Sequence, residues 1–284
     1  MPSTYAHYVF GRRLLSMYPE PLAAQIRAAR PLFDIGVHGP DLLFYFKPLF
    51  SNAVNSIGYS MHGRPASEFF GPAKEVYQRA ENKRESLAYL MGFVSHFALD
   101  SACHGYIENK IRVSNVRHTE IESEFDRTLL LSEGKEPLSA RLTEHIAAAR
   151  ENAAVIAPFF GKVTQAQVYK ALRSMLFYNN LLRAPHFPKR QMVLAALRLS
   201  GNYTEMHGMM IAKKPIPACE DSSLRLSKLF EKALAACVPL SEEYIAYLRG
   251  EGGLPAAFSA AFGPAPGWEN IPVLSLEEEK KYEV

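Results

Sequence analysis

The run LAYLMGFVSHFAL, from Leu87 to Leu99, constrains the fold more than any other stretch, because it is apolar almost all round a helix. A helix of this kind has no face suited to water, so it is buried among other elements. The sequence therefore predicts a buried central helix over about residues 84 to 110.

Helical periodicity dominates the rest of the chain as well, and no convincing pair of alternating strands is present. Proline and glycine mark the joints, as in GRP at 63–65 and GGLP at 252–255. We expect an all-α, compact multi-helix domain over residues 1–284, with a metal cluster within about 1–133 and a helical scaffold over 134–284. The other predicted helices cover 4–18, 21–29, 66–81, 115–133, 140–156, 164–182, 187–200, 222–236 and 241–249.

Composition narrows the class of protein. A chain of 284 residues with 48% hydrophobic content can bury a sizeable core, and a net charge of +3 with mixed signs gives no dedicated nucleic-acid patch. The three cysteines stand at unrelated spacings, which argues against disulfides or a cysteine-only zinc site. Neither a leader peptide nor an apolar run of about 18 residues is recognisable, so we expect a cytoplasmic protein without a transmembrane segment. The oligomeric state is not readable from the sequence.

Two imidazoles and a carboxylate stand four residues apart in the central helix, at His96, Asp100 and His104. Residues at i, i+4 and i+8 of an α-helix lie within about 80° of one another. The three side chains therefore share one side of a helix that is itself in or near the core.

Two further helices direct polar groups inward. Glu122, Phe125 and Leu129 lie within about 40° of His118 around their helix. His7 similarly shares a side with apolar residues of the first helix. By contrast, the periodicity assigns a solvated face to Glu120, Glu124 and Arg127.

A carboxylate among core residues must be compensated, because an isolated buried charge is costly. Zinc accepts both imidazole nitrogen and carboxylate oxygen, and i, i+4 pairs supply two such ligands without backbone strain. Taken alone, His7 reads as a hydrogen-bonded core histidine, and His118 with Glu122 reads equally well as a buried pair. Considered jointly, the three inward-facing groups favour metal binding.

The remaining histidines, His38, His145, His186 and His207, have no such company and are interpreted as surface or structural residues. The aromatic runs at 44–46 and 69–70 are more typical of core than of a substrate wall.

The strings MPSTYAHYVFG, HGPDLLFYF, MHG at 61–63, GFVSHFALDSACHGYI and HTEIESEFD together resemble the bacterial zinc-dependent phospholipase C family, in particular its unsecreted branch. The resemblance spans about residues 1 to 133. It implies an all-α fold with two or three zinc ions in a cleft, as in the related single-strand-specific nucleases. It also implies that the ligands of a closely spaced pair of ions are His62, His96, Asp100 and Asp41, with His7 completing one of them.

The same resemblance implies a more separate ion held by His104, His118 and Glu122. Two features depart from the secreted relatives. The second histidine of the central helix follows Asp100 by four residues instead of six, and no tryptophan is available near the N-terminus to donate its amine. Removal of the initiator methionine would expose the imino nitrogen of Pro2, which is one candidate replacement; the alternative is that Ser3 or Thr4 caps the first helix.

The resemblance implies a zinc-dependent hydrolase that attacks a phosphodiester with a metal-activated water, and a phospholipid is the substrate it suggests. Asp41 is the candidate catalytic residue that orients or deprotonates this water, and Asp126 is a candidate outer partner of the imidazoles. A nuclease or small-molecule phosphodiesterase is the enzymatic alternative, with Tyr45 and Phe46 as possible stacking residues. The other alternative is a non-catalytic module that metal stabilises. Open positions at the metal sites would favour catalysis, and closed four-ligand sites would favour structure.

Overall fold

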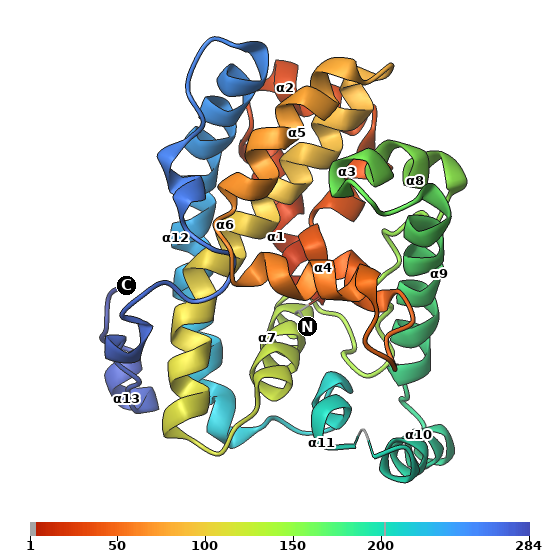
Figure 1. Ribbon diagram of the computed structural model, residues 1–284. Coiled ribbons are helices and arrows are strands. Elements are labelled where there is room, and N and C mark those ends of the chain that lie inside the picture. The colour runs from red at the N-terminus through yellow and green to blue at the C-terminus, as the bar shows by residue number, and fades with distance from the viewer. Residues whose placement is uncertain (1–3, 202) are drawn as a thin grey trace.

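The computed structural model describes residues 4–201 and 203–284, and within these residues it contains α- and 3-10 helices but no strand (Figure 1). The all-α prediction is confirmed. The α-helices are α1 Thr4–Met17, α2 Glu20–Arg27, α3 Arg30–Gly36, α4 Ala53–His62, α5 Ser67–Arg79, α6 Lys83–Val113, α7 His118–Ser132, α8 Arg150–Ile156, α9 Gln165–Leu182, α10 Phe187–Leu199, α11 Tyr203–Met206, α12 Glu220–Arg249 and α13 Leu276–Glu279. The 3-10 helices are η1 Gly39–Tyr45, η2 Ala157–Phe160, η3 His207–Met209, η4 Pro217–Cys219, η5 Ala256–Ser259 and η6 Trp268–Asn270.

The predicted central helix is α6, which spans 31 residues. Asn82 caps its start, because the Asn82 side chain accepts a hydrogen bond from the Glu85 backbone N–H at 3.2 Å. Every residue from Ser86 to Asp100 is buried, as expected for a helix that is apolar all round. Helices α1, α3, α7 and α12 pack around it (Figure 1).

Helix α3 crosses α6 where two glycines meet. A β-carbon at Gly36 would lie 2.3 Å from the Tyr89 backbone oxygen, and one at Gly92 would lie 2.3 Å from that of Phe33. Only glycine permits this approach of two backbones. The chain that leaves α3 is therefore held directly against α6, where Gly39, with φ of 49°, fits against the His96 ring.

Two helix predictions differ from the structure. Residues 140–149 are irregular, and only α8 forms within the predicted helix 140–156. Tertiary contacts override helical propensity there, since His145 bonds His38 and the Asn152 amide donates to the Ala147 carbonyl. The two helices predicted over 222–236 and 241–249 are one helix, α12, which continues through Pro239.

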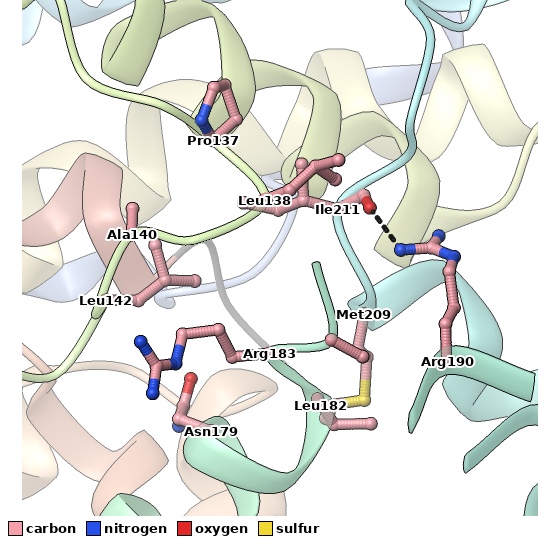
Figure 2. A pocket seen from close by; sticks show the side chains of 11 residues that line it. Pro137, Leu138, Ala140, Leu142, Asn179, Leu182, Arg183, Arg190, Met209 and Ile211 are labelled. Atoms are coloured by element: carbon pink, nitrogen blue, oxygen red, sulfur yellow. Dashed lines mark hydrogen bonds between the residues drawn. The ribbon is translucent and has the colours of Figure 1, made fainter. Parts of the chain in front are cut away.

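Helices α10 and α11 form a peripheral unit with its own small apolar cluster of Leu182, Ala184, Val193, Leu197 and Met210. A cavity of about 30 Å³ lies where this unit meets the segment 137–142 (Figure 2). Its two arginines are engaged with backbone: Arg183 donates to the Ser139 carbonyl and Arg190 to that of Ile211. None of the predicted site residues lines this cavity.

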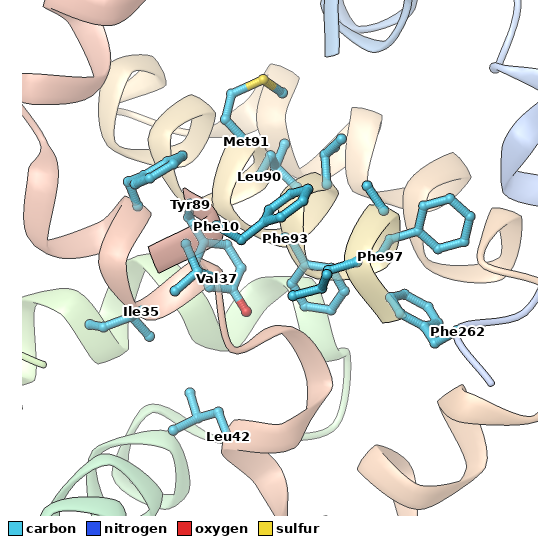
Figure 3. Packing of buried hydrophobic residues seen from close by; sticks show 14 of the residues in the cluster. Phe10, Ile35, Val37, Leu42, Tyr89, Leu90, Met91, Phe93, Phe97 and Phe262 are labelled. Carbon is cyan, nitrogen blue, oxygen red and sulfur yellow. The ribbon is translucent and has the colours of Figure 1, made fainter. Parts of the chain in front are cut away.

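The main core is one cluster that reaches from Tyr5 to Phe262 along the sequence (Figure 3). Aromatic side chains fill its centre: Phe69 stacks on Phe93 with ring centroids 3.9 Å apart, and Phe262 packs edge-on against Phe97 at 5.3 Å. Phe262 thereby ties the C-terminal segment to the central helix. This contact matters for the site, because the next residues of that segment reach the predicted metal ligands.

Candidate metal centre

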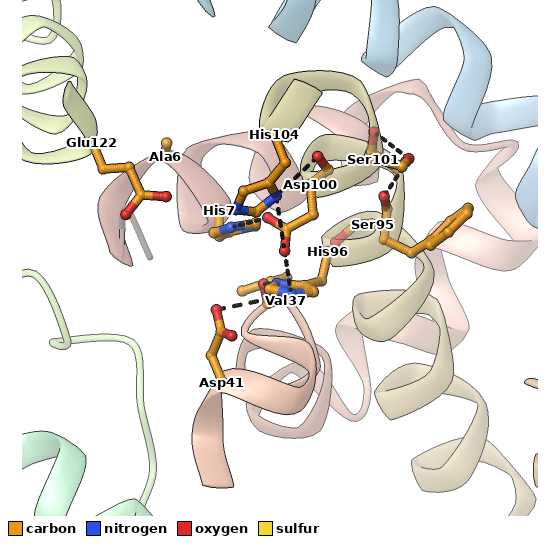
Figure 4. Close-up of polar contacts among 12 residues, drawn as sticks. Ala6, His7, Val37, Asp41, Ser95, His96, Asp100, Ser101, His104 and Glu122 are labelled. Atoms are coloured by element: carbon orange, nitrogen blue, oxygen red, sulfur yellow. Dashed lines mark hydrogen bonds and ion pairs between the residues drawn. The ribbon is translucent and has the colours of Figure 1, made fainter. Parts of the chain in front are cut away.

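All eight predicted ligands converge in one region of the molecule. Figure 4 labels His7, Asp41, His96, Asp100, His104 and Glu122 among them. They come from five elements, namely α1, η1, the last residue of α4, α6 and α7. Their donor atoms form three groups, and within each group the atoms lie within 4.8 Å of one another. The groups are His7, His96 and Asp100; Asp41, His62 and His96; and His104, His118 and Glu122.

Asp100 joins the first two groups. Its Oδ1 lies 3.1 Å from His7 Nε2, and its Oδ2 lies 3.0 Å from His96 Nε2 and 3.6 Å from His62 Nε2. Asp41 faces the same imidazoles from η1, with Oδ1 3.0 Å from His62 Nε2 and Oδ2 3.8 Å from His96 Nε2. Two ligands at about 2.0–2.2 Å from one zinc ion are themselves about 3–4 Å apart, so these spacings suit the metal.

The third group has a carboxylate on each side of one imidazole. His118 Nε2 lies 2.9 Å from Glu122 Oε1, and His118 Nδ1 lies 3.4 Å from Glu108 Oε1. Glu108 is absent from the predicted site, although it stands four residues after His104 in the sequence. A carboxylate on the second nitrogen of a ligating histidine fixes its tautomer and orientation.

Backbone carbonyls orient three of the imidazoles. The Nδ1 atoms of His62, His96 and His104 lie 2.8, 3.3 and 3.1 Å from the carbonyl oxygens of Gly58, Val37 and Asp100, respectively. Since a carbonyl only accepts, each Nδ1 carries the proton and each neutral ring presents its Nε2 lone pair to the site. A lone pair that faces a carboxylate oxygen at 3 Å requires a cation or a proton between them.

Several buried polar atoms of the site lack hydrogen-bond partners, which also indicates that cations belong there. Buried polar atoms normally have hydrogen-bond partners, so a cluster of exceptions needs an explanation. Here the atoms without a hydrogen-bond partner among the described residues include His7 Nδ1, both carboxylate oxygens of Asp41, His96 Nε2, Asp100 Oδ2, His118 Nε2 and Glu122 Oε2. The residues present therefore fit a set of bound divalent ions.

The buried carboxylates and imidazoles of the site shift one another's pKa values. Burial by itself would raise the pKa of Asp100, but His96 and His104 outweigh it and hold this pKa well below its ordinary value. Burial lowers the pKa of His62, whereas the nearby carboxylates of Asp100 and Asp41 raise it, with a net result of about 10. Without metal, protons thus occupy positions that a cation would otherwise fill.

One prediction about α7 needs correction. Glu124 is buried and not on a solvated face, and Arg127 pairs with it at 3.1 Å and compensates its charge. The Asp126 carboxylate accepts hydrogen bonds from the backbone N–H groups of Tyr5 and Ala6, at 3.0 and 2.8 Å. These hydrogen bonds hold the start of α1, which carries His7, against α7. Pro2 and Ser3 lie outside the described residues.

His38 and His145 form a buried pair with each other, which the sequence interpretation did not predict. Their Nε2 atoms lie 2.8 Å apart, and Tyr8 stacks on the His145 ring with centroids 4.0 Å apart. His38 is fully buried. The pair fastens the irregular segment 140–149 to the turn that precedes Asp41.

The ligands open onto a cleft of about 270 Å³. Its aromatic wall is Phe44, which stacks on Tyr59 with ring centroids 4.2 Å apart. The stacking residues suggested by the sequence, Tyr45 and Phe46, are buried elsewhere. The remaining lining is formed by Gly63, Gly263, Pro264, Asp41, His62, Asp100, His104, Glu108, His118 and Glu122.

Comparison with known families gives one match, to the zinc-dependent phospholipase C model over residues 6–172. No curated protein and no solved structure matches the chain. In the part of the chain that the structure describes, every helix is too short or too polar to cross a membrane. The family match covers more than half of the chain and all eight predicted ligands. This chain belongs to the zinc-dependent phospholipase C family.

Proposed function

We propose that the protein is a zinc-dependent hydrolase of phosphodiesters, with a phospholipid-type substrate, and that it works as one domain. The observation that carries this proposal is the set of buried nitrogen and oxygen atoms that lack hydrogen-bond partners and border a single cleft. The family match supports zinc as the metal and a phospholipid as the substrate class.

The number of ligands favours catalysis over a purely structural role. Each of the three groups offers three protein donors. Structural zinc sites are closed by four protein ligands, whereas catalytic sites keep one position open. Each of the three groups contains at least one residue that lines the cleft, so an open position there is accessible to substrate.

We assign Asp41 the role of orienting the attacking water. Zinc, when bound, supplies positive charge that stabilises a phosphoryl oxygen and makes water acidic enough to react near neutral pH. Burial raises the pKa of Asp41, but His96 and His62 lower it by more than burial raises it. The pKa therefore lies below its ordinary value, and this carboxylate stays ionised. An ionised carboxylate accepts a hydrogen bond from water and directs the water's lone pair at the phosphorus.

The proposal is tested with protein prepared in zinc without chelators. We expect two or three zinc ions per chain by elemental analysis, and release of diacylglycerol from phosphatidylcholine in mixed micelles. Bis(p-nitrophenyl) phosphate and a single-stranded oligonucleotide serve as non-lipid phosphodiesters. Hydrolysis of the oligonucleotide alone would favour the nuclease alternative, and full zinc loading without hydrolysis of any substrate would favour a metal-stabilised module.

A further inference from the structure

The loop that joins η1 to α4, residues 47–52, presents apolar side chains to solvent. Leu49 is 50% exposed and Phe50 is 74% exposed. A single exposed apolar side chain is normal on a protein surface, whereas exposed apolar residues that stand together mark interaction sites. Here two of them are neighbours in one short loop, so their exposure needs a physical reason.

Hydrogen bonds brace this loop in one conformation. The Asn52 side-chain amide donates to the carbonyls of Phe46 and Phe50, at 3.0 and 2.9 Å. The side-chain amide of the buried Asn55 donates to the same Phe50 carbonyl at 2.9 Å. Lys47 has a φ of 50°, a left-handed conformation that is costly for a residue with a β-carbon. The backbone is therefore held in a strained form that keeps both apolar side chains outside.

Helix α9 lies beside η1, from which the loop leaves, and has an exposed face of similar character (Figure 1). Several of its exposed residues recur every three or four positions and therefore share one side of the helix: Lys170, Arg173, Phe177 and Leu181. Lys170 links this side to the loop, because its Nζ lies 5.7 Å from the centroid of the Phe46 ring. We refer to the loop 47–52 and this side of α9 together as the loop–α9 surface.

The positive charge of the loop–α9 surface is not neutralised by carboxylates. The sequence has no aspartate or glutamate in the stretches 42–67 and 152–204, which supply the loop, α4, α9 and α10. On other faces, exposed arginines of α1, α2 and α5 pair with glutamates. Within the described residues, Lys47, Lys170 and Arg173 instead lie over aromatic rings and pair with no carboxylate. The surface is therefore complementary to an anionic partner.

Exposed apolar side chains beside unpaired basic ones suit the surface of an anionic bilayer. Aromatic and aliphatic side chains enter the boundary between headgroups and acyl chains, while lysine and arginine are attracted to acidic headgroups. The charge alone would also attract single-stranded nucleic acid, which binds by stacking its bases on aromatic rings. A leucine cannot stack on a base, and the loop presents Leu49 beside Phe50. The bilayer therefore fits both parts of the surface.

We propose that the loop–α9 surface docks the protein on anionic lipid bilayers, with Leu49 and Phe50 inserted among the headgroups and the basic side of α9 against them. None of the exposed side chains of this surface lines the metal cleft, so docking is separate from hydrolysis. Helix α4 has 10 residues and runs from the loop to His62. Its length is about 15 Å, so a docked loop holds the metal cleft close to the bilayer.

Vesicle flotation tests docking directly. The zinc-loaded protein is mixed on ice with vesicles of phosphatidylcholine, with and without phosphatidylglycerol, at low and at high salt. We expect flotation with the anionic vesicles and its weakening by salt. No flotation, or equal flotation with neutral vesicles, would overturn the proposal.

Diacylglycerol release in the same samples reports hydrolysis separately. Flotation without release would support docking and contradict the proposed function, whereas release without flotation would support the function and overturn docking. Tighter binding to a single-stranded oligonucleotide than to anionic vesicles would also overturn the proposal, and would assign the surface to nucleic acid.

Matched variants locate the surface. Leu49→Ser is compared with Leu131→Ser on α7, because these leucines are 50% and 49% exposed. Leu49→Ser and Phe50→Ser are each expected to lower vesicle partition about tenfold, and Leu131→Ser is expected to leave it unchanged. Arg173→Gln is expected to lower it about fivefold, with the exposed Arg84→Gln as control. All five variants are expected to keep wild-type zinc content. Wild-type partition in both loop variants would overturn the location.

Discussion

At the scale of single residues, the site depends on carboxylates that are buried before any metal arrives. Asp100 lies close to four imidazoles, and its Oδ2 has no hydrogen-bond partner among the described residues. Its burial is therefore unfavourable unless protons or cations neutralise the cluster. Folding of this region and binding of metal are consequently linked.

Asp100→Asn tests this link. We expect the variant to lose at least one zinc ion per chain, because a neutral amide cannot replace a carboxylate that faces His7 and His96 of the first group and His62 of the second. The loss of affinity is expected to exceed the ~10–100-fold typical of changes to outer partners of a metal site. Asp34→Asn is the matched control, since Asp34 is also buried but pairs with Arg30. Equal zinc content in the two variants would contradict our assignment of Asp100.

The His38–His145 pair predicts how stability depends on pH. Burial, assisted by the charges of Arg30 and Lys135, lowers the pKa of His145 to about 3. Below its ordinary pKa of about 6.5, the unfolded chain binds a proton that the folded protein excludes. The stabilisation is therefore complete above pH ~6.5 and is lost as the pH falls toward ~3, by up to about 1.4 kcal/mol per pH unit.

His145→Gln is expected to be less stable than wild type at pH 7.5 and to lose less stability on acidification, so the two converge by pH 5.5. Urea unfolding at pH 7.5, 6.5 and 5.5 measures the difference. The exposed His186→Gln variant is the control and is expected to follow the wild type. Parallel pH profiles for wild type and His145→Gln would refute the buried, neutral state of this histidine.

At the scale of elements, the crossing of α3 and α6 determines where Asp41 lies. Gly36 and Gly92 allow backbone contact at the crossing, and the chain continues from there through Val37 and His38 into η1. The Val37 carbonyl at the same crossing orients the His96 ring. A change in the separation of these two helices therefore moves a carboxylate and an imidazole of the site together.

Gly36→Ala is expected to destabilise the protein by roughly 1–3 kcal/mol, as overpacking does, because its β-carbon would lie 2.3 Å from backbone. Gly71→Ala in α5 is expected instead to stabilise the protein. Its β-carbon would lie 3.8 Å from Leu254 Cδ2, an ordinary contact, so the helical propensity of alanine should add up to ~1 kcal/mol. Chemical denaturation measures both, and a neutral Gly36→Ala would show that the crossing tolerates a wider spacing.

At the scale of the whole molecule, one core and one cluster of ligands hold the chain together. Elements α1, η1 and α7 pack on α6, and α4 packs on η1, so ions bound between them would resist the separation of these elements. A ligand that binds only the folded state adds about 2.7 kcal/mol at 100 times its Kd. For a chain of this size, 1 kcal/mol shifts Tm by roughly 2–4 °C.

Removal of zinc with a chelator is thus expected to lower Tm by roughly 5–10 °C. Differential scanning calorimetry of protein treated with EDTA, compared with protein treated with zinc-saturated EDTA, separates loss of metal from any effect of the chelator. Re-addition of zinc should restore the transition. An identical Tm in both samples would mean that the cluster contributes nothing to folding.

Most of the longer helices and the direction of many of their side chains were predictable from the sequence, because both follow from local periodicity. Helices α3 and α4 were not among the predicted ones. The stretch 84–110 corresponds to α6, and His118 with Glu122 shares the buried side of α7 with Phe125. The inward direction of His7, Asp100 and Glu122 was likewise predictable from their angular positions around their helices and from the free-energy cost of burying a charge.

What lies opposite a given side chain was decided only by the tertiary structure, because contacts between distant segments leave no local pattern. The periodicity of 140–156 gave no sign that His145 would hold part of it in an irregular conformation against His38. The periodicity of α7 likewise did not reveal the arginine pairing that lets Glu124 be buried. Gly263 and Pro264 reach the metal cleft from the far end of the chain. The close packing of aromatic rings around Phe262 in the core, and not the local sequence, fixes where that segment lies.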